Sequence, residues 1–294
     1  MLVNINGHIT EAAQAKIQIF DRGFLYGDSL YEVMRTQNGK LFQATEHLRR
    51  LAISAQLCRM TLNQTNEEYV REMNKTLEAF HRLPGMARAE AYVRLIVTRG
   101  VGEIGFGLKS VKTPSQFVII VKAQAPLTDA DFERGLTLQV SQRLRNDRRA
   151  LDPAMKSGNY LNSLLAFLEA EAEGYNDSLM ANAEGHLTEG TTFNIFYVNR
   201  GIIATPPLDI GILDGITRLD LIRVAKKLDI PVREVRFPKA RLYEADEVFI
   251  SSTLRGAFPV VRVDKHPIGR GALAGKPGPV TRRLSEAYRQ FSGT

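Results

Sequence analysis

The stretch Met155-Lys156-Ser157-Gly158-Asn159-Tyr160-Leu161-Asn162-Ser163-Leu164-Leu165-Ala166 is the most informative part of this chain. It places a lysine at the end of an extended segment, just before an amphipathic helix. Such a lysine can be held in a cleft, where the loss of water favours its neutral, nucleophilic amine. This placement alone is weak evidence, because most lysines are solvated surface charges. Lys156 is therefore a candidate catalytic residue that needs support from the rest of the sequence.

The composition is that of a globular protein with two domains. The chain has 294 residues, of which 44% are hydrophobic, and this is enough to bury a substantial core. Apolar runs fall well short of the roughly 18 residues of a membrane span, and the N-terminus lacks a signal-peptide pattern, so we expect a cytoplasmic protein with no membrane partner. The single cysteine, Cys58, indicates a small core residue, and the scattered histidines predict no metal site.

The net charge of +7 raises the question of a nucleic-acid partner. The densest basic run is Arg143-Leu144-Arg145-Asn146-Asp147-Arg148-Arg149. Aromatic residues do not interleave this run and the chain has no tryptophan, so a stacking platform for bases has little support. We therefore expect a solvated surface at this run and no nucleic-acid partner.

The first third of the chain alternates strand and turn signals, which predicts an α+β lobe. Asn-Gly pairs predict hairpins over residues 4–9 and between 31–35 and 40–42. A helix follows, with Thr45 as its expected N-cap. Its apolar face comprises Leu48, Leu51, Ala52 and Ala55, and the other expected elements are a helix over 67–80 and strands over 91–97 and 117–121.

A formal match to the dinucleotide fingerprint GxGxxG occurs at Gly100-Val101-Gly102-Glu103-Ile104-Gly105. A dinucleotide turn must open a helix at once and needs an acidic residue about 20 positions later. Here more glycine follows, then Pro114 and a second strand. The segment is therefore interpreted as a loop between strands.

The second half of the chain begins after a stretch of linker composition. We expect a small N-terminal domain over 1–122, a linker over 123–135 and a larger domain over 136–294. In the larger domain, Leu161, Leu164, Leu165 and Leu168 predict the apolar stripe of a helix that ends before Gly174. Strands are expected over 136–140, 178–182, 193–198 and 247–251.

Two turns of this half could cradle an anion. Asp214-Gly215-Ile216-Thr217-Arg218 opens a predicted helix that runs to about Leu228, and Ser251-Ser252-Thr253 ends a strand. A helix N-terminus offers unpaired N–H groups to a phosphate, although each turn alone is more often just a capped helix. Glu189 is either an exposed turn residue or a carboxylate that keeps a pyridine nitrogen protonated. Together with Lys156, these elements indicate pyridoxal 5'-phosphate chemistry.

At this point the chain resembles a known family, the class IV (fold type IV) pyridoxal-phosphate-dependent aminotransferases, the group of branched-chain and D-amino-acid enzymes. The likeness covers nearly the whole chain. Its motifs are the run from Lys156 to Ala166, Glu189-Gly190 with Asn194-Ile195-Phe196, Thr205-Pro206-Pro207, Gly215-Ile216-Thr217-Arg218, Ala245-Asp246-Glu247-Val248-Phe249, Asp21-Arg22-Gly23-Phe24, Tyr26-Gly27-Asp28, Tyr31-Glu32-Val33 and Glu46-His47-Leu48-Arg49-Arg50-Leu51. The resemblance implies a small N-terminal α+β lobe, a larger C-terminal lobe with a β-barrel-like sheet and helices, and a homodimer.

The resemblance also implies roles for individual residues. Lys156 would be the catalytic residue, binding the cofactor covalently and moving a proton at the substrate Cα. Glu189 would partner the pyridine nitrogen, and Arg50 would bind the phosphate, although its position on the helix is that of a solvated charge. The remaining implied cofactor contacts are Ile216, Thr217 and Thr253 at the phosphate and Tyr160 at the ring oxygen, although the branched-chain pattern usually places one more residue between lysine and tyrosine.

The motifs divide on which branch of the family is meant. Tyr92-Val93-Arg94 and the loop Gly105-Phe106-Gly107, which in family dimers reaches into the partner's active site, resemble the branched-chain enzymes. The Arg-x-His carboxylate trap typical of the D-amino-acid branch is replaced by Ile104-Gly105-Phe106. Asp21-Arg22-Gly23, Val33 and the Lys-to-Tyr spacing instead resemble the D-amino-acid branch. Arg255 stands where branched-chain enzymes usually have a small residue near the substrate carboxylate.

We therefore expect a transferase that moves an amino group between a hydrophobic or branched-chain L-amino acid and a 2-oxo acid such as 2-oxoglutarate. The alternative is a D-amino-acid or R-amine transaminase, and a lyase of the aminodeoxychorismate type ranks third. Arginine forks suit a substrate carboxylate. The expected substrate-binding residues are Tyr31, Arg35, Tyr92, Arg94, Phe106, Leu254 and Arg255.

Overall fold

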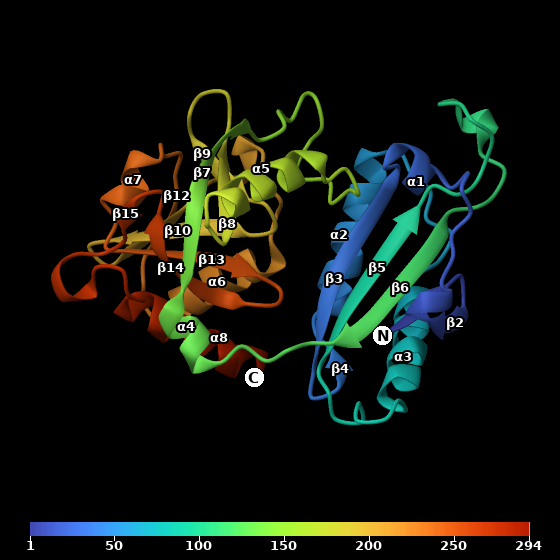
Figure 1. Cartoon of the computed structure of the whole chain (residues 1–294), viewed down its shortest axis with the longest axis horizontal. Coiled ribbons are helices and arrows are strands. Elements are labelled where there is room, and N and C mark those ends of the chain that lie inside the picture. Colours follow the sequence, from blue (N-terminus) through green and yellow to red (C-terminus); the bar gives the residue numbers. More distant parts are fainter. Residues whose placement is uncertain (294) are drawn as a thin grey trace. The chain divides into compact units, whose positions relative to one another are not determined.

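The computed structural model describes residues 1–293, which form two compact units (Figure 1). Unit 1 comprises Met1–Ala125 together with Met155–Asn159, and unit 2 comprises Pro126–Ala154 and the chain from Tyr160 onward. The stretch 123–135, expected as a linker, contains helix α4 (Asp129–Arg134). The segment Met155–Asn159 was expected in the larger domain, but its contacts assign it to unit 1.

Unit 1 is built on an antiparallel sheet with the strand order β2-β1-β6-β5-β3-β4. Both predicted hairpins are confirmed, and their Asn6-Gly7 and Asn38-Gly39 turns have positive φ at each residue, as a tight type I′ turn requires. The strands are β1 (Leu2–Ile5), β2 (His8–Glu11), β3 (Ser29–Gln37), β4 (Lys40–Leu41), β5 (Ala91–Thr98) and β6 (Gln116–Ala123).

Two helices cover one face of this sheet. Helix α2 (Ala44–Leu57) buries Leu48, Leu51 and Ala55 as predicted, and α3 (Asn66–His81) packs beside it. The prediction of Thr45 as N-cap is wrong, because the helix begins earlier. Gln43 takes a left-handed conformation after β4 and accepts the first helical hydrogen bond from the His47 N–H. Short helices complete the unit at α1 (Arg22–Tyr26), η1 (Ala12–Gln14) and η2 (Leu108–Ser110).

The glycine-rich segment 100–105 is confirmed as a loop between β5 and β6. Isolated bridges pair Asp21 with Val101 and Gly102 with Val111, and they tie the loop to itself and to the start of α1. The next helical turn is the short η2. The geometry therefore lacks the long helix that a dinucleotide turn needs.

Unit 2 contains a sheet that closes on itself. Its strand order is β12-β11-β10-β13-β14-β7-β8-β9, and a further pairing of β9 with β10 joins the last strand back to the middle of the series. The strands from β10 through β9 therefore form a closed barrel, which confirms the expected fold class. The strands are β7 (Leu136–Leu144), β8 (Asp177–Ala181), β9 (Leu187–Gly190), β10 (Asn194–Asn199), β11 (Ile202–Thr205), β12 (Val232–Glu234), β13 (Glu247–Ser252), β14 (Gly256–Val263) and β15 (His266–Pro267).

Strand alternation gives unit 2 two apolar layers. Ile195 and Ile250 belong to the cluster that also holds Phe193 and Phe258, whereas Phe196 and Phe249 stack with ring centroids 4.8 Å apart in a second cluster. That second cluster is completed by α6 (Ile216–Lys227) and α8 (Pro279–Ser292). The other helices are α5 (Leu161–Ala172), α7 (Ala240–Tyr243), η3 (Leu208–Ile210) and η4 (Gly271–Leu273).

Helix α5 begins and ends where predicted, but it buries a different face. Leu161, Leu164 and Leu168 are exposed by 67%, 48% and 47%, so the prediction that they form the core stripe is wrong. The buried residues are Ser163, Ala166 and Ala170, whose small side chains let α5 approach β7 and β8 closely. Gly174, with φ of 81°, follows the helix as its predicted terminator.

Two further features bear on the expectations from composition. Cys58 is half-buried at the edge of the unit 1 core, and burial raises the pKa of its thiol. Within residues 1–293, helices that combine the length and the apolar character needed to cross a membrane are absent.

Candidate active site

Lys156 lies at the edge of strand β3. Its carbonyl accepts a hydrogen bond from the Tyr31 N–H at 3.0 Å, and its own N–H donates to Ser54 Oγ of α2 at 3.1 Å. Two residues later, the Gly158 N–H donates to the Ser29 carbonyl at 2.7 Å. The segment thus extends the sheet at the end of β3 away from β4, and a Cβ at Gly158 would lie only 2.2 Å from Ser29 Oγ.

The Lys156 amine is held against Tyr31. Nζ donates to the tyrosine hydroxyl at 3.2 Å and lies 4.5 Å from the ring centroid. The guanidinium carbon of Arg94 lies 4.3 Å from the same centroid. Tyr31 is buried, and its aromatic ring contacts both the Lys156 amine and the Arg94 guanidinium.

Four of the expected substrate residues share one face of the sheet. Arg35 is paired with Tyr92 across β3 and β5, and Tyr31 and Arg94 lie on the same side by strand alternation. Nε of Arg94 is buried and has no hydrogen-bond partner within residues 1–293. A half-buried guanidinium with an unused donor at its buried Nε suits the carboxylate of an amino acid.

The opposite face of β3 carries a buried ionic cluster that the sequence did not predict. Glu32 accepts hydrogen bonds from Arg50 Nε at 2.8 Å and Nη2 at 2.7 Å, and His47 Nδ1 lies 2.7 Å from Glu32 Oε2. Burial alone would raise the pKa of Glu32, but Arg50 and His47 outweigh it and lower that pKa to about 2. Burial lowers the pKa of His47.

Arg50 is therefore not the solvated charge that its place on the helix indicated. It is 9% exposed, and the carboxylate of Glu32 fixes its guanidinium in a bidentate pair. A guanidinium held rigidly in this way is suited to binding a phosphate.

Phe106, the last expected substrate residue of unit 1, lies on the loop between β5 and β6. Its ring packs 5.2 Å from that of Tyr26, and the residue is 83% exposed. A single chain does not place Phe106 on the sheet face that carries Tyr31 and Arg94.

In unit 2, Glu189 lies at the end of β9 and is buried. Its Oε1 accepts hydrogen bonds from Arg145 Nε at 3.0 Å and Nη2 at 2.9 Å, and its Oε2 accepts one from the Leu213 N–H at 3.0 Å. The prediction that the basic run 143–149 is a solvated surface is wrong for Arg145, whose side chain is only 15% exposed. These hydrogen bonds fix the orientation of the carboxylate.

The N-terminus of α6 lies beside this carboxylate. Asn194 pairs with Glu189 across the strands, and its amide donates to the Leu213 carbonyl at 3.0 Å. Gly215 is the N-cap of α6 and makes no side-chain capping bond, while a Cβ at this position would lie 2.1 Å from Asn194 Oδ1. The first helical residues, Ile216 and Thr217, are buried. The free N–H groups of a first helical turn are suited to binding an anion.

The second expected turn adjoins the same strands. Asn194 of β10 pairs with Ser251 of β13, and Ser251 Oγ is buried with no hydrogen-bond partner in the described part of the chain. Thr253 and Leu254 are half-buried in the turn that follows, and Arg255 is exposed. The other expected cofactor residue of unit 2 is Tyr160, which is the N-cap residue of α5.

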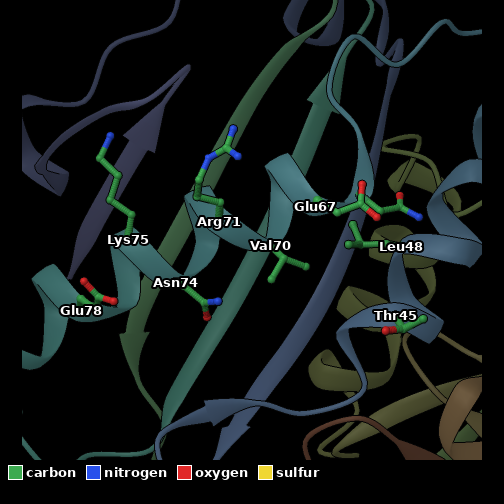
Figure 2. Close-up of a pocket in the computed structure, with 9 residues that line it drawn as sticks. Thr45, Leu48, Glu67, Val70, Arg71, Asn74, Lys75 and Glu78 are labelled. Atoms are coloured by element: carbon green, nitrogen blue, oxygen red, sulfur yellow. The ribbon is translucent and has the colours of Figure 1, made fainter.

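A surface hollow of about 800 Å³ lies elsewhere in unit 1, between α2 and α3 (Figure 2). Val70, Arg71 and Asn74 are among its lining residues, and the expected site residues are not. The hollow therefore does not mark the chemistry that the lysine, the carboxylate and the anion turns indicate.

Comparison with known proteins gives the family. Residues 29–263 match the family model described as amino-transferase class IV. This chain belongs to the class IV aminotransferases. It is similar to the putative branched-chain-amino-acid aminotransferase of Methanocaldococcus jannaschii, with 36% identity over 99% of this chain and 96% of the relative.

This class IV aminotransferase is similar to members of both branches of the family. It is 32% identical to the D-alanine aminotransferase of Staphylococcus aureus, strain N315, over 98% of this chain and 96% of that one. Its structure is similar to that of the branched-chain amino acid aminotransferase from Thermobaculum terrenum in its PLP form, with a TM-score of 0.85, 28% identity and coverage of 99% of this chain and 93% of the other. The fold is thus fold type IV.

Class IV aminotransferases use pyridoxal 5'-phosphate, and the donor set of this enzyme fits that group. The uncapped mouth of α6 and the unpartnered Ser251 hydroxyl beside it offer donors to an anion. Glu189 offers a fixed carboxylate to a protonated ring nitrogen, and Lys156 offers an amine to an aldehyde.

Replacement of Glu32 by glutamine will lower stability in a pH-dependent way. Because the folded-state pKa is about 2 against an ordinary 4.5, the carboxylate contributes about 3 kcal/mol at pH 7, at 1.36 kcal/mol per pKa unit. This contribution is fully present above pH 4.5 and is lost as the pH falls toward 2. Urea unfolding should show that the difference between wild type and E32Q shrinks by roughly 1 to 2 kcal/mol between pH 6 and pH 3. A difference that stays constant with pH contradicts the assignment, and E78Q, at an exposed glutamate of α3, is the matched control.

Replacement of Arg145 by methionine will weaken cofactor binding, because Glu189 loses its bidentate partner. We expect the Kd for pyridoxal phosphate, measured by equilibrium dialysis, to rise by about tenfold, the scale of a lost charge-assisted pair. The control is R143M, since Arg143 is a neighbour with a half-exposed side chain that pairs with Glu169. Equal affinities of R145M and R143M would show that Arg145 does not support the carboxylate.

Proposed function

We propose that this enzyme transfers an amino group from a hydrophobic, branched-chain L-amino acid to a 2-oxo acid such as 2-oxoglutarate, with pyridoxal phosphate as cofactor. The observation that carries the proposal is the placement of the Lys156 amine 3.2 Å from the Tyr31 hydroxyl, with Arg94 on the same ring. An amine, an aromatic ring and a guanidinium suited to a carboxylate thus lie side by side in unit 1, which supports the proposal. The name of the Methanocaldococcus jannaschii relative supports the substrate class.

Pyridoxal phosphate, when bound, would supply an aldehyde for amino groups and a protonated ring that can take up electron density from the substrate Cα. Lys156 would hold the cofactor through its amine and would move the proton at the substrate Cα. The Tyr31 hydroxyl keeps that amine in place. Glu189, oriented by Arg145, holds a proton at the ring nitrogen.

The remaining cofactor contacts are assigned to the phosphate and the ring oxygen. The N–H groups at Ile216 and Thr217 and the hydroxyl of Thr253 would bind the phosphate, and so would Arg50. Glu32 keeps Arg50 rigid for this purpose. Tyr160 is proposed as the hydrogen-bond partner of the ring oxygen.

Substrate selection is assigned to the arginines and the aromatic wall. Arg94, with its unpartnered Nε, is the favoured carboxylate ligand, and Arg35 lies on the same face. Tyr31 and Tyr92 form an apolar surface for the side chain of the substrate. Leu254 and Arg255 of unit 2 are proposed as further substrate contacts.

We also propose that the enzyme is a cytoplasmic homodimer. Support for the homodimer comes from apolar residues on the β5–β6 loop and on helix α5 that remain exposed in the single chain. The most exposed are Ile104, Phe106, Leu108 and Leu161. In the dimer, Phe106 would contact the substrate of the partner subunit.

The second candidate function is D-amino-acid or R-amine transamination. It is favoured by the 32% identity to the Staphylococcus aureus D-alanine aminotransferase and by Arg255, whose exposed side chain could bind a carboxylate.

A half-reaction screen separates the two functions. L-Leucine, D-alanine and (R)-1-phenylethylamine are each added to the holoenzyme without an oxo acid, and conversion of the cofactor to its pyridoxamine form is followed by absorbance. We expect L-leucine to react fastest, because the aromatic wall favours a branched side chain. Faster conversion by D-alanine would overturn the substrate assignment.

Replacement of Lys156 by alanine will strongly reduce turnover while leaving the fold intact. We expect the transamination rate to fall by roughly 10³-fold, the scale of a lost proton-transfer group, and the visible absorption of the covalently held cofactor to disappear. The control is K75A, at a lysine of α3 whose side chain is 52% exposed. Retention of both signals in K156A would contradict the catalytic assignment.

A further inference from the structure

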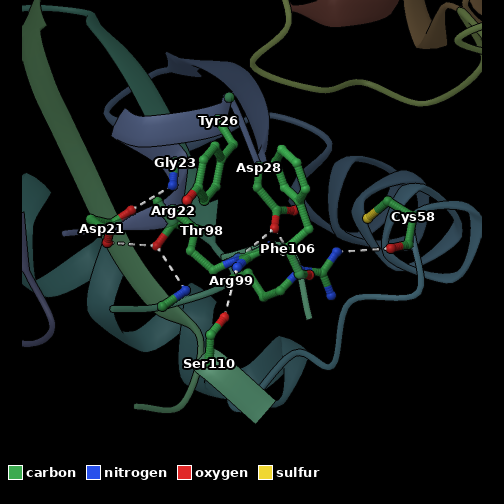
Figure 3. Close-up of polar contacts among 12 residues, drawn as sticks. Asp21, Arg22, Gly23, Tyr26, Asp28, Cys58, Thr98, Arg99, Phe106 and Ser110 are labelled. Atoms are coloured by element: carbon green, nitrogen blue, oxygen red, sulfur yellow. Dashed lines mark hydrogen bonds and ion pairs between the residues drawn. The ribbon is translucent and has the colours of Figure 1, made fainter. Parts of the chain in front are cut away.

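The loop between β5 and β6 has an apolar tip. Polar contacts link the loop to Arg22 and Tyr26 of α1 (Figure 3). Ile104, Phe106 and Leu108 at the tip are exposed by 77%, 83% and 68%. Within one chain, burial of these side chains cannot hold the tip in place. Its conformation depends instead on polar contacts to its backbone.

Arg22 makes the central contacts. This residue of α1 is 5% exposed, and its guanidinium points to the inner side of the loop. Nη1 donates to the Gly105 carbonyl at 2.6 Å and to Ser110 Oγ at 3.3 Å, and Nη2 donates to the Phe106 carbonyl at 3.4 Å. One buried side chain thus joins both sides of the loop.

Asp28 anchors Arg22 to the rest of the unit. Its Oδ2 accepts hydrogen bonds from Arg22 Nε at 3.0 Å and from Arg99 Nε at 2.7 Å. Arg99 in turn donates to the carbonyls of Cys58 at 2.9 Å and Arg59 at 2.8 Å, at the end of α2. The hydrogen bond to Asp28 raises the pKa of Arg99 further above its usual value.

Tyr26 holds the tip from its other side. Its hydroxyl accepts a hydrogen bond from the Gly105 N–H at 3.0 Å, and its ring contacts Phe106 at 5.2 Å. Arg22 also lies 5.1 Å from the Tyr26 ring. Both polar groups of Gly105 are therefore bound, and the ring of the next residue is packed against the tyrosine that binds one of them.

We propose that Arg22 and Tyr26 are positioning residues that determine substrate specificity by fixing the orientation of Phe106. This inference rests on the proposed function, in which Phe106 contacts the apolar side chain of the substrate in a second copy of the chain. Arg22 and Tyr26 do not touch the substrate. They set the distance between the Phe106 ring and the side chain of a large substrate. Binding of a substrate with a small side chain depends little on this distance.

The test compares donors of different size with the holoenzyme and the variants Y26F, F106A and Y26F/F106A. Tyr26→Phe removes the hydroxyl that binds Gly105 and keeps the ring. We expect the KM for L-leucine to rise about three- to tenfold, the effect of one hydrogen bond, with kcat within about twofold. The KM for L-alanine should change by less than about twofold.

The double variant tests whether Tyr26 acts through Phe106. If it does, Y26F/F106A will have the same KM for L-leucine as F106A, because the positioned ring is already missing. Multiplicative effects of the two changes would overturn the proposal, and so would an equal rise in KM for L-leucine and L-alanine. The control is Y243F, which removes a tyrosine hydroxyl bonded to Asp264 in unit 2.

Hydrogen exchange gives a readout that does not depend on activity. Amides 104–108 should exchange faster in Y26F and in R22K, while those of β5 keep their wild-type protection. Unchanged exchange at 104–108 in both variants overturns the proposal even if activity changes. If the wild-type enzyme does not use L-leucine, the proposed function fails. The positioning role would still be supported if amides 104–108 exchange faster in the variants and the KM for the donor that the enzyme does use is altered.

Discussion

The backbone hydrogen bonds between residues 156–158 and strand β3 are the constraint on which the chemistry of unit 1 depends. They attach a lysine to a tyrosine that lies 125 positions earlier in the sequence. A shift of the strand register by one residue would turn every side chain of the segment to the opposite face of the sheet. Because Tyr31 and Lys156 are joined through both backbone and side chain, the amine is held opposite the aromatic ring and not at the surface.

The same strand separates two kinds of charge by the alternation of its side chains. Tyr31 and Arg35 face the side that receives the substrate in the proposed function, while Glu32 between them faces α2 and holds Arg50. The Glu32 carboxylate and the proposed substrate-binding side chains thus lie on the same strand but on opposite faces of the sheet. The cost of burying Glu32 is offset by the guanidinium of Arg50 and by the hydrogen bond to His47, as the direction of the shift in the Glu32 pKa indicates.

Local signals made much of the fold predictable. The Asn-Gly pairs predicted both hairpins because few other residue pairs accept two successive positive φ angles. The Gly215 turn predicted the start of α6. Closure of the barrel could not be predicted in this way, because the parallel pairings of β7 with β8 and β14 join segments that are distant in sequence.

The errors in the site have a common physical origin. A periodic pattern identifies an apolar face but not what covers it, so the leucines of α5 were assigned to a core that small residues occupy instead. Burial of an ion pair depends on a partner whose distance in sequence is arbitrary. Arg145 meets Glu189 from 44 positions away, and nothing in its own neighbourhood distinguishes it from Arg143. The roles of Lys156 and Glu189 came from the combination of motifs and not from either residue alone.

The closure of the barrel determines where the carboxylate of Glu189 lies. The register between β9 and β10 contains the single pair Glu189 and Asn194, so the backbone of the residue proposed to serve the cofactor ring forms the seam of the barrel. Its side chain accepts hydrogen bonds from Arg145 and from the Leu213 N–H. A shift of this register by one residue would turn the carboxylate to the opposite face of the sheet, so Glu189 meets Arg145 only when the barrel closes in this register.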